Sequence, residues 1–207
     1  MKRIIAGALL LPTVALAQGR NEVSYDYFDI DYFRTDWDSG ATEDPGEGWA
    51  GRFSVGIRDH VFVSAEYRAW ELDSNDDAGS TFKRIGFGVH GDIGERWSLF
   101  GEAGFKALDL DLGAGNIQDD PGYIGGGARW YVGDGYELRL SADWTENGKG
   151  TPVGVGEAAV TFGGDIYLTD VATLSFEFNE NDDNTTTFMM GMRFYHKKDR
   201  DNLRQSR

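Results

Sequence analysis

The chain contains no cysteine, so disulfide bonds cannot stabilise it even in an oxidising compartment. It also lacks any apolar run as long as the roughly 20 residues that a transmembrane helix needs. Basic residues are few: 20 Lys and Arg stand against 35 Asp and Glu, which gives a formal net charge of −15. Phosphate groups would repel so acidic a chain. These absences argue against a disulfide-stabilised module, a helical membrane protein and a nucleic-acid partner.

Residues 1–17 have the three parts of a bacterial signal peptide. Two basic residues begin the segment, and an apolar run over 4–11 follows that is too short to span a membrane. Ala-Leu-Ala over 15–17 supplies the small residues of a cleavage site, so we expect cleavage before Gln18. A buried N-terminal helix is the alternative. The mature chain is therefore predicted to be periplasmic, secreted or inserted in the outer membrane.

The stretch from Trp49 to Leu72 alternates between apolar and polar residues on both sides of a short break at Asp59-His60. A period of two is that of a β-strand, because successive side chains point to opposite faces, and two such runs predict a hairpin. One row is apolar or glycine, whereas the other is mostly small, polar or charged, with Phe62 and Trp70 as exceptions. That pattern indicates lipid on one side of the sheet and a polar lumen on the other. The polar row includes Arg52, Ser54, Ser64, Glu66 and Arg68.

The same alternation recurs along the chain and predicts about ten strands, with eight as the alternative. Long acidic loops are expected at 35–48, 73–80, 109–121 and 179–184, a long loop with glycine and proline at 145–154, and short turns at 59–60, 93–96, 133–135 and 169–171. Outer-membrane barrels have an even number of strands, short periplasmic turns and longer external loops. The fold class predicted for residues 18–196 is therefore all-β, a closed antiparallel transmembrane β-barrel.

The first expected strand, 23–34, contains a change of phase. Apolar residues fall on odd positions up to Tyr27 and on even positions from Phe28. A β-bulge at this point would reconcile the two halves. Beyond the bulge, Asp29 and Asp31 are expected to face the lumen.

Aromatic residues lie near the predicted strand ends, where the girdles of a membrane barrel belong; they include Trp49, Trp97, Trp130 and Trp144. Together with the signal peptide, the strand–turn rhythm and the closing run TFMMGMRF over 187–194, this pattern resembles the small outer-membrane barrel proteins of the OmpA/OmpX kind.

The resemblance implies a location in the cell outer membrane, in contact with lipid and lipopolysaccharide. It also implies that the barrel-assembly machinery recognises an aromatic residue at the end of the last strand, here Phe194 or Tyr195. The polar, basic segment 197–207 continues past that aromatic residue, which departs from the family pattern. We expect it to be a periplasmic tail.

The charges predicted to face the lumen have both signs. Side chains can fill the interior of a small barrel, and a buried charge must be paired because leaving it unpaired is costly. We therefore expect an ion-pair network in the lumen, with a narrow porin-like channel for small polar solutes as the alternative. The predicted inward charges are Asp29, Asp31, Glu66, Glu102, Glu137, Asp143, Glu157, Asp165, Glu177, Arg52, Arg68, Arg84, Lys106, Arg129, Arg139 and Arg193.

A catalytic site is not expected. Hydrolysis requires a nucleophile, a base and an orienting acid close together, and the three histidines are His60, His90 and His196. Of these, only His90 is predicted to face the lumen. A barrel enzyme acting on lipid or peptide is the third alternative. The expected role is structural, or surface interaction through the loops.

The external loops are acidic, and their oxygen atoms suit hard divalent cations. The pair Asp182-Asp183 is flanked by Asn181 and Asn184, but its spacing does not match a twelve-residue calcium loop. We therefore interpret the loop acids as solvated charges and assign no metal or cofactor site.

Overall fold

The computed structural model describes residues 24–37, 46–72, 75–111, 116–119, 121–133, 135–146, 158–182 and 185–196. The predicted signal peptide (1–17) and the predicted tail (197–207) lie outside the described residues. Within the described ranges, no helix has the length and apolar character needed to cross a membrane.

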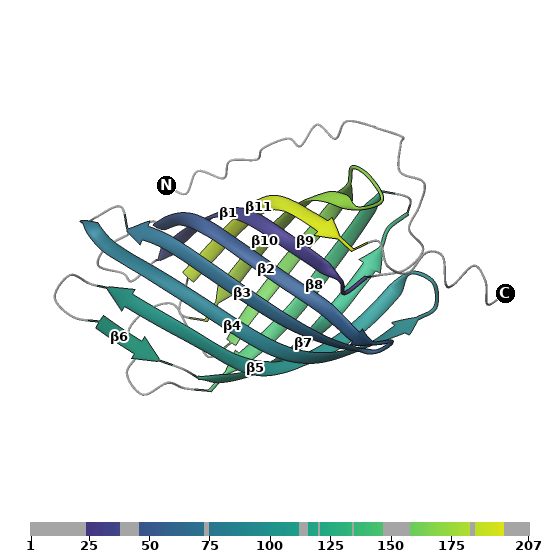
Figure 1. Cartoon of the computed structure of the whole chain (residues 1–207), viewed down its shortest axis with the longest axis horizontal. Helices are drawn as coiled ribbons and strands as arrows, with labels where there is room; N and C mark the ends of the chain where they lie inside the picture. Colours follow the sequence, from purple (N-terminus) through teal and green to yellow (C-terminus); the bar gives the residue numbers. More distant parts are fainter. Residues whose placement is uncertain are drawn as a thin grey trace.

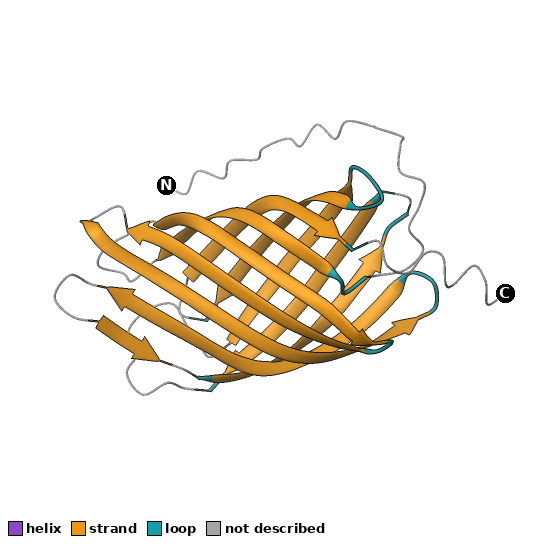
Figure 2. Ribbon diagram, viewed as in Figure 1, coloured by secondary structure: helices purple, strands orange, loops and turns teal. Residues whose placement is uncertain are grey.

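Antiparallel strands form one closed barrel, as Figures 1 and 2 show. Ten strands make the wall, because β1 pairs with β11 and β4 pairs with β5. Among the described residues, the short β6 pairs with β5 alone. The strands are β1 (Tyr27–Trp37), β2 (Gly46–Arg58), β3 (Val61–Leu72), β4 (Asn75–Ile93), β5 (Trp97–Asp111), β6 (Asn116–Asp119), β7 (Gly122–Tyr131), β8 (Tyr136–Thr145), β9 (Ala158–Tyr167), β10 (Ala172–Asn181) and β11 (Thr185–Tyr195).

The short turns all lie at one end of the barrel, which we call the turn end; the opposite end is the loop end. The turns follow β2, β4, β7 and β9, as predicted from the sequence. The first and last described residues also reach the turn end, where the His196 N–H donates to the Asp26 carbonyl at 3.1 Å. In an antiparallel wall with an even number of strands, the first strand begins and the last strand ends at the same end of the barrel.

Most connections at the loop end are shorter than predicted, although the one between β8 and β9 runs over 146–157 and is longer than the expected 145–154. β4 begins at Asn75 and β10 runs to Asn181, so the loops expected over 73–80 and 179–184 are largely strand. β5 likewise continues to Asp111, inside the third expected loop. The sequence of these strand ends is mostly polar and lacks the alternation, which is only required where one face meets lipid. Backbone pairing therefore continues where the hydrophobic pattern stops.

The predicted β-bulge near Tyr27-Phe28 is wrong. β1 pairs in unbroken register with both β2 and β11. Tyr27 contacts the inward-facing Arg193, whereas Phe28 is exposed on the outer surface. The inward side chains are tyrosines near the turn end and carboxylates further along β1. A tyrosine combines an apolar ring with a polar hydroxyl, so it fits the mouth of a lumen as well as a lipid surface.

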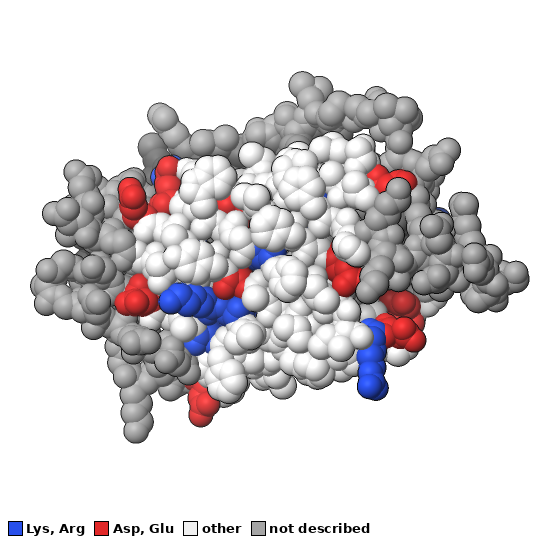
Figure 3. Space-filling model, in the orientation of Figure 1, with Lys and Arg blue, Asp and Glu red and all other residues white. Residues whose placement is uncertain are grey.

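The outer surface of the wall is apolar and the inner surface is ionic. Phe87 and Phe105 on the outside are 55% and 65% exposed, whereas the inward Arg193 is fully buried. Figure 3 shows uncharged residues covering most of the wall on one face. Each strand of the wall contributes to the outer belt, for example through Ile30, Phe53, Tyr67, Phe87, Phe105, Ile124, Leu140, Phe162, Phe178 and Phe188.

Aromatic side chains border this belt at both ends. At the loop end, the Tyr32 and Trp49 rings meet edge-on with centroids 5.7 Å apart. At the turn end, Trp97 and Trp130 stack at 5.0 Å. Paired girdles of this kind match the two interfaces of a bilayer.

Candidate functional site: the lumen

Nearly every predicted inward charge lies in a short contact with a charge of opposite sign. Glu157 lies outside the described residues. The remaining charges form three groups, which differ in position and in the strands that supply them. The sequence predicted which residues face inward; the pairs themselves depend on which strands become neighbours.

The first group is a ring of three arginines and three carboxylates. Arg193 donates two hydrogen bonds of 2.7 Å to Asp29 and one of 2.9 Å to Asp165. On the other side of the ring, Arg52 lies 3.1 Å from Asp29 and 2.5 Å from Glu177.

Arg139 closes this ring more loosely. Its Nε lies 3.7 Å from the Asp165 carboxylate, and its Nη1 lies 4.0 Å from Glu177. The six residues come from β1, β2, β8, β9, β10 and β11, so we call them the six-strand ion ring. Asp31 adds a further contact, 2.9 Å from Arg52. The ring joins strands that lie on both sides of the β1–β11 seam.

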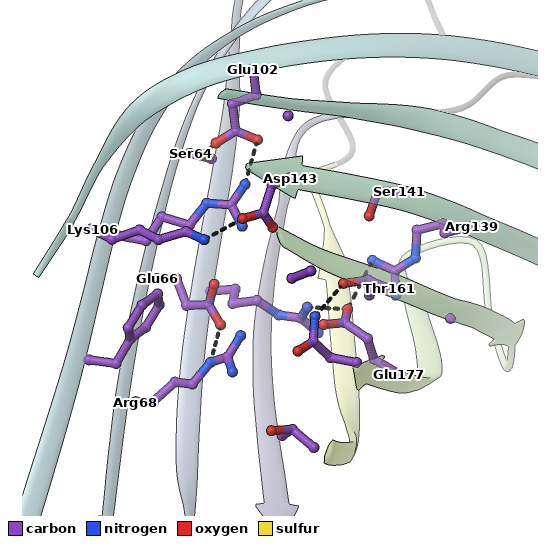
Figure 4. Close-up of a pocket in the computed structure, with 18 of the residues that line it drawn as sticks. Ser64, Glu66, Arg68, Glu102, Lys106, Arg139, Ser141, Asp143, Thr161 and Glu177 are labelled. Carbon is purple, nitrogen blue, oxygen red and sulfur yellow. Dashed lines mark hydrogen bonds and ion pairs between the residues drawn. The ribbon is translucent and has the colours of Figure 1, made fainter. Parts of the chain in front are cut away.

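The second group lies on the other side of the lumen, on strands β3, β4, β5 and β8 (Figure 4). Arg84 lies 3.3 Å from Glu102, and Lys106 binds Asp143 and, at 2.8 Å, Thr145. The third pair visible in Figure 4 is Arg68 with Glu66, at 2.6 Å. The residues labelled in Figure 4 are Ser64, Glu66, Arg68, Glu102, Lys106, Arg139, Ser141, Asp143, Thr161 and Glu177.

A glycine makes room for this second group. The Ser64 and Tyr123 hydroxyls both hydrogen-bond to Glu102. A Cβ atom at Gly86 would overlap the Glu102 carboxylate and the Tyr123 hydroxyl. The absence of a side chain at Gly86 therefore lets two inward groups from β5 and β7 meet above β4.

The third group forms an aromatic layer at the turn end. Tyr131, Tyr167 and Tyr195 are buried against one another, with Tyr27 packed beside them. Glu137 lies beneath this layer. It accepts a hydrogen bond of 2.6 Å from Arg129 and one of 3.1 Å from the Tyr167 hydroxyl.

A cavity of about 200 Å³ runs between these groups. It reaches from Tyr25 and Phe62 near the turn end to Trp70 and Thr185 near the loop end. The lining mixes charged, hydroxyl and aromatic side chains, as Figure 4 shows for part of it.

The histidines lie apart from these ion pairs. His90 faces inward as predicted and stacks on Tyr25 at 4.0 Å. His60 is exposed in the β2–β3 turn, and His196 is exposed after β11. The contact between Tyr25 and His90 was not predicted from the sequence. The sequence did contain this information, because Tyr25 and the inward Asp29 are four residues apart and therefore point to the same face of an extended chain.

Of the loop acids, six lie outside the described residues: Asp38, Glu43, Asp44, Asp73, Asp120 and Asp183. Asp36 is described and pairs with Arg34 at 3.3 Å. Within the described part of the chain, no group of three or more His, Cys, Asp or Glu side chains is arranged to hold a metal ion.

A closed barrel with a lipid-compatible exterior and a charged interior is the architecture of an outer-membrane β-barrel protein, and this chain is a small member of that class. No family model matches the chain, and no curated protein matches it.

Solved structures of small outer-membrane barrels are similar to it. Neisserial surface protein A shares 13% identity at a TM-score of 0.38, covering 84% of this chain and 98% of its own. The N-terminal barrel of Pseudomonas aeruginosa OprF shares 14% at 0.41, covering 86% and 100%. Ail of Yersinia pestis shares 14% at 0.39, covering 83% and 100%. At these identities the similarity concerns the fold alone.

Proposed function

We propose that the protein has a structural or surface-interaction role in the outer membrane, and that paired charges keep its lumen closed to solutes. The six-strand ion ring carries this proposal. Its members are held by two or more partners each, and most of them are almost fully buried. A solute crossing on the side of the lumen that the ring occupies would have to separate buried charges, and each separated charge would lose its compensation.

The narrowness of the barrel supports the same proposal. Bore increases with strand number, and the side chains of a ten-stranded wall reach far into the lumen. The aromatic layer at the turn end adds a second barrier on the same side of the lumen as the ring. On that side of the lumen, the ring and the aromatic layer are two barriers in series.

A surface-interaction role is supported by the wall at the loop end. β4 and β5 extend well beyond their neighbours there, and β6 continues the sheet along β5 (Figure 1). A rigid sheet that projects from the bilayer can present a fixed surface to a partner. We also propose contact with membrane lipid and lipopolysaccharide through the outer belt, and recognition of the outward Phe194 by the assembly machinery.

Planar-bilayer recording of the purified protein tests the closed lumen. We expect no stable, large channel. Glu66→Ala or Arg68→Ala should destabilise the barrel more than it changes conductance, because the pair links neighbouring inward positions on β3. A large and stable open channel in the unmodified protein would overturn the proposal.

A narrow channel for small polar solutes is the second candidate, and the cavity favours it. Liposome swelling with sugars of graded size distinguishes the two. Swelling that falls off with solute size indicates a channel, whereas a closed lumen gives no swelling with any sugar.

We further propose that the protein is not an enzyme and uses no cofactor. His90 supports this, because its ring is stacked on Tyr25 at 4.0 Å and is tilted against Phe62 at 6.3 Å, so aromatic side chains hold it. Incubation with phospholipid vesicles and with unstructured peptides is the check. Release of fatty acid or peptide fragments, abolished by His90→Ala, would establish the enzyme alternative.

A further inference from the structure

The residues before β1 cross the turn end of the barrel. Tyr25 lies outside any strand, yet only 6% of it is exposed. Its hydroxyl lies 3.2 Å from the Ser98 hydroxyl on β5. Three strands separate β1 from β5 around the wall, so the Tyr25 side chain reaches across the lumen to get there.

An aromatic cage holds the Tyr25 ring. The ring stacks on His90 at 4.0 Å and on Phe62 at 4.8 Å, and it meets Phe100 edge-on at 6.2 Å. The Arg129 guanidinium lies 4.8 Å from the ring centroid, within cation–π range. The cage therefore draws on β3, β4, β5 and β7, all remote from the chain segment that supplies the tyrosine.

Hydrogen bonds hold the neighbouring residues in place. The Ser24 carbonyl accepts a bond of 2.7 Å from Arg129 Nη1, and the Asp26 carboxylate accepts one of 2.6 Å from the Gly56 N–H. The Asp26 N–H also donates to the Ser24 hydroxyl at 3.2 Å. We call Ser24–Asp26 the N-terminal strap.

The wall beneath the strap is built from small residues. Inward positions on β2, β4 and β5 are occupied there by Ser54, Gly56, Gly88 and Ser98. A Cβ atom at Gly88 would overlap the Phe62 ring, so the glycine makes space for the cage. The tyrosine layer fills the other half of this end, and Tyr25 occupies the half that the strands leave open.

The cavity described above ends at the strap. Tyr25 and Phe62 line it near the turn end, and the six-strand ion ring lies on strands from the opposite half of the wall. The strap therefore closes the part of the lumen that the ring leaves unobstructed.

We propose that the N-terminal strap is a displaceable stopper, and that its release opens a narrow path through the barrel for water and small ions. This rests on the proposed closed lumen and names the group that completes the closure. The strap lies outside the strand ladders, so it can leave without breaking any pairing within the wall. Its contacts are one ring in a cage and a few hydrogen bonds.

The test uses the mature full-length protein and two readouts. Tyr25→Ala is compared with the unmodified protein in planar bilayers, where we expect small, frequent ion currents to appear. Tyr136→Ala is the matched control, because Tyr136 lies at the same end but faces outward. Retained heat-modifiable mobility on electrophoresis shows that each variant is folded.

The second readout is thiol labelling, which has no background because the chain lacks cysteine. Ser54→Cys places a thiol at a buried inward position next to the strap, and Thr187→Cys places one near the loop end. We expect Tyr25→Ala to speed labelling at position 54 about tenfold, since labelling follows the fraction of time that a site is open. Labelling at position 187 should not change.

If Tyr25→Ala does not fold, Asp26→Ala removes the bond to Gly56 while keeping the tyrosine, and it should shift both readouts in the same direction. A folded variant with no current and unchanged labelling at position 54 overturns the stopper and leaves the closed lumen standing. A large current through the unmodified protein overturns the closed lumen, and the labelling ratio still decides whether the strap obstructs the path.

Discussion

At the scale of single residues, the charges in the lumen depend on one another. Arg193 has no exposed surface, and its partners Asp29 and Asp165 have almost none. Removing one member of such a set leaves the others buried without compensation, which costs far more than the pair contributes when it is intact.

Arg193→Met should therefore destabilise the folded barrel strongly, by about 3–5 kcal/mol. Urea titration in detergent or lipid, followed by tryptophan fluorescence, measures this change. Arg34→Met is the control, because Arg34 pairs with Asp36 and Glu47 in solvent, and exposed pairs contribute about 0–1 kcal/mol. Equal losses in the two variants would contradict the structural role of the ion ring.

Close packing in the lumen gives a second prediction. Gly86→Ala should destabilise the barrel by about 1–3 kcal/mol, because the added methyl overlaps Glu102 and Tyr123 and displaces their hydrogen bond. Gly51→Ala on β2 is the matched control, since a Cβ there meets no atom within 4 Å. Unfolding midpoints in urea give the comparison, and a loss at Gly51 as large as that at Gly86 would argue against crowding as the cause.

The sequence predicted the side of the wall for these residues but not their contacts. The alternation along each strand was enough to predict that Arg52, Glu66 and Arg193 face inward. When one face of a strand is apolar, its charged side chains must lie on the other face. The pairing of Arg193 with Asp29 joins residues 164 positions apart. That contact depends on which strands close the barrel, and no local pattern contains this information.

At the scale of strands, alternation marks the part of each strand that lies in lipid and says little about the rest. The hairpin of β2 and β3 was predicted with its turn at Asp59-His60, because both strands alternate over nearly their whole length. The start of β4 at Asn75 was missed, since residues 75–80 include no large apolar side chain that could show the alternation. Tyr25 was assigned to the wrong face because a tyrosine suits either side.

The position of the belt along a strand leads to a third prediction. Phe87 lies near the middle of the outward row of β4, and Ile57 lies beside the β2–β3 turn. Phe87→Arg should cost about 2–4 kcal/mol in lipid, whereas Ile57→Arg should cost about 0–1 kcal/mol, because the penalty for a cation falls toward the interface. Unfolding from phospholipid vesicles measures both. Equal penalties would contradict the assigned membrane level.

At the scale of the whole molecule, closure of the barrel brings the first and last strands together. β1 and β11 pair over their full length, from Tyr27 with Tyr195 to Trp37 with Thr185. An open sheet would expose unpaired backbone groups to lipid, where no water can satisfy them.

This closure predicts that the seam is the most sensitive part of the wall. Ile30→Pro removes a backbone donor from β1 where it faces Met192, so it should prevent closure and abolish heat-modifiable mobility on electrophoresis. Arg34→Pro, nearer the loop end of the same strand, is the milder control, because the pairs beyond it can fray into water. A folded, heat-modifiable barrel with proline at position 30 would show that closure tolerates a break in the seam.

The seam also has a consequence for biogenesis. The strand that completes the wall is encoded last, so every shorter intermediate has two open backbone edges and cannot enter the hydrocarbon layer unaided. We therefore expect insertion to follow the pairing of β11 with β1. Until that pairing forms, the two open edges are free to pair wrongly with other extended chains, so we expect the unpaired chain to be prone to aggregation.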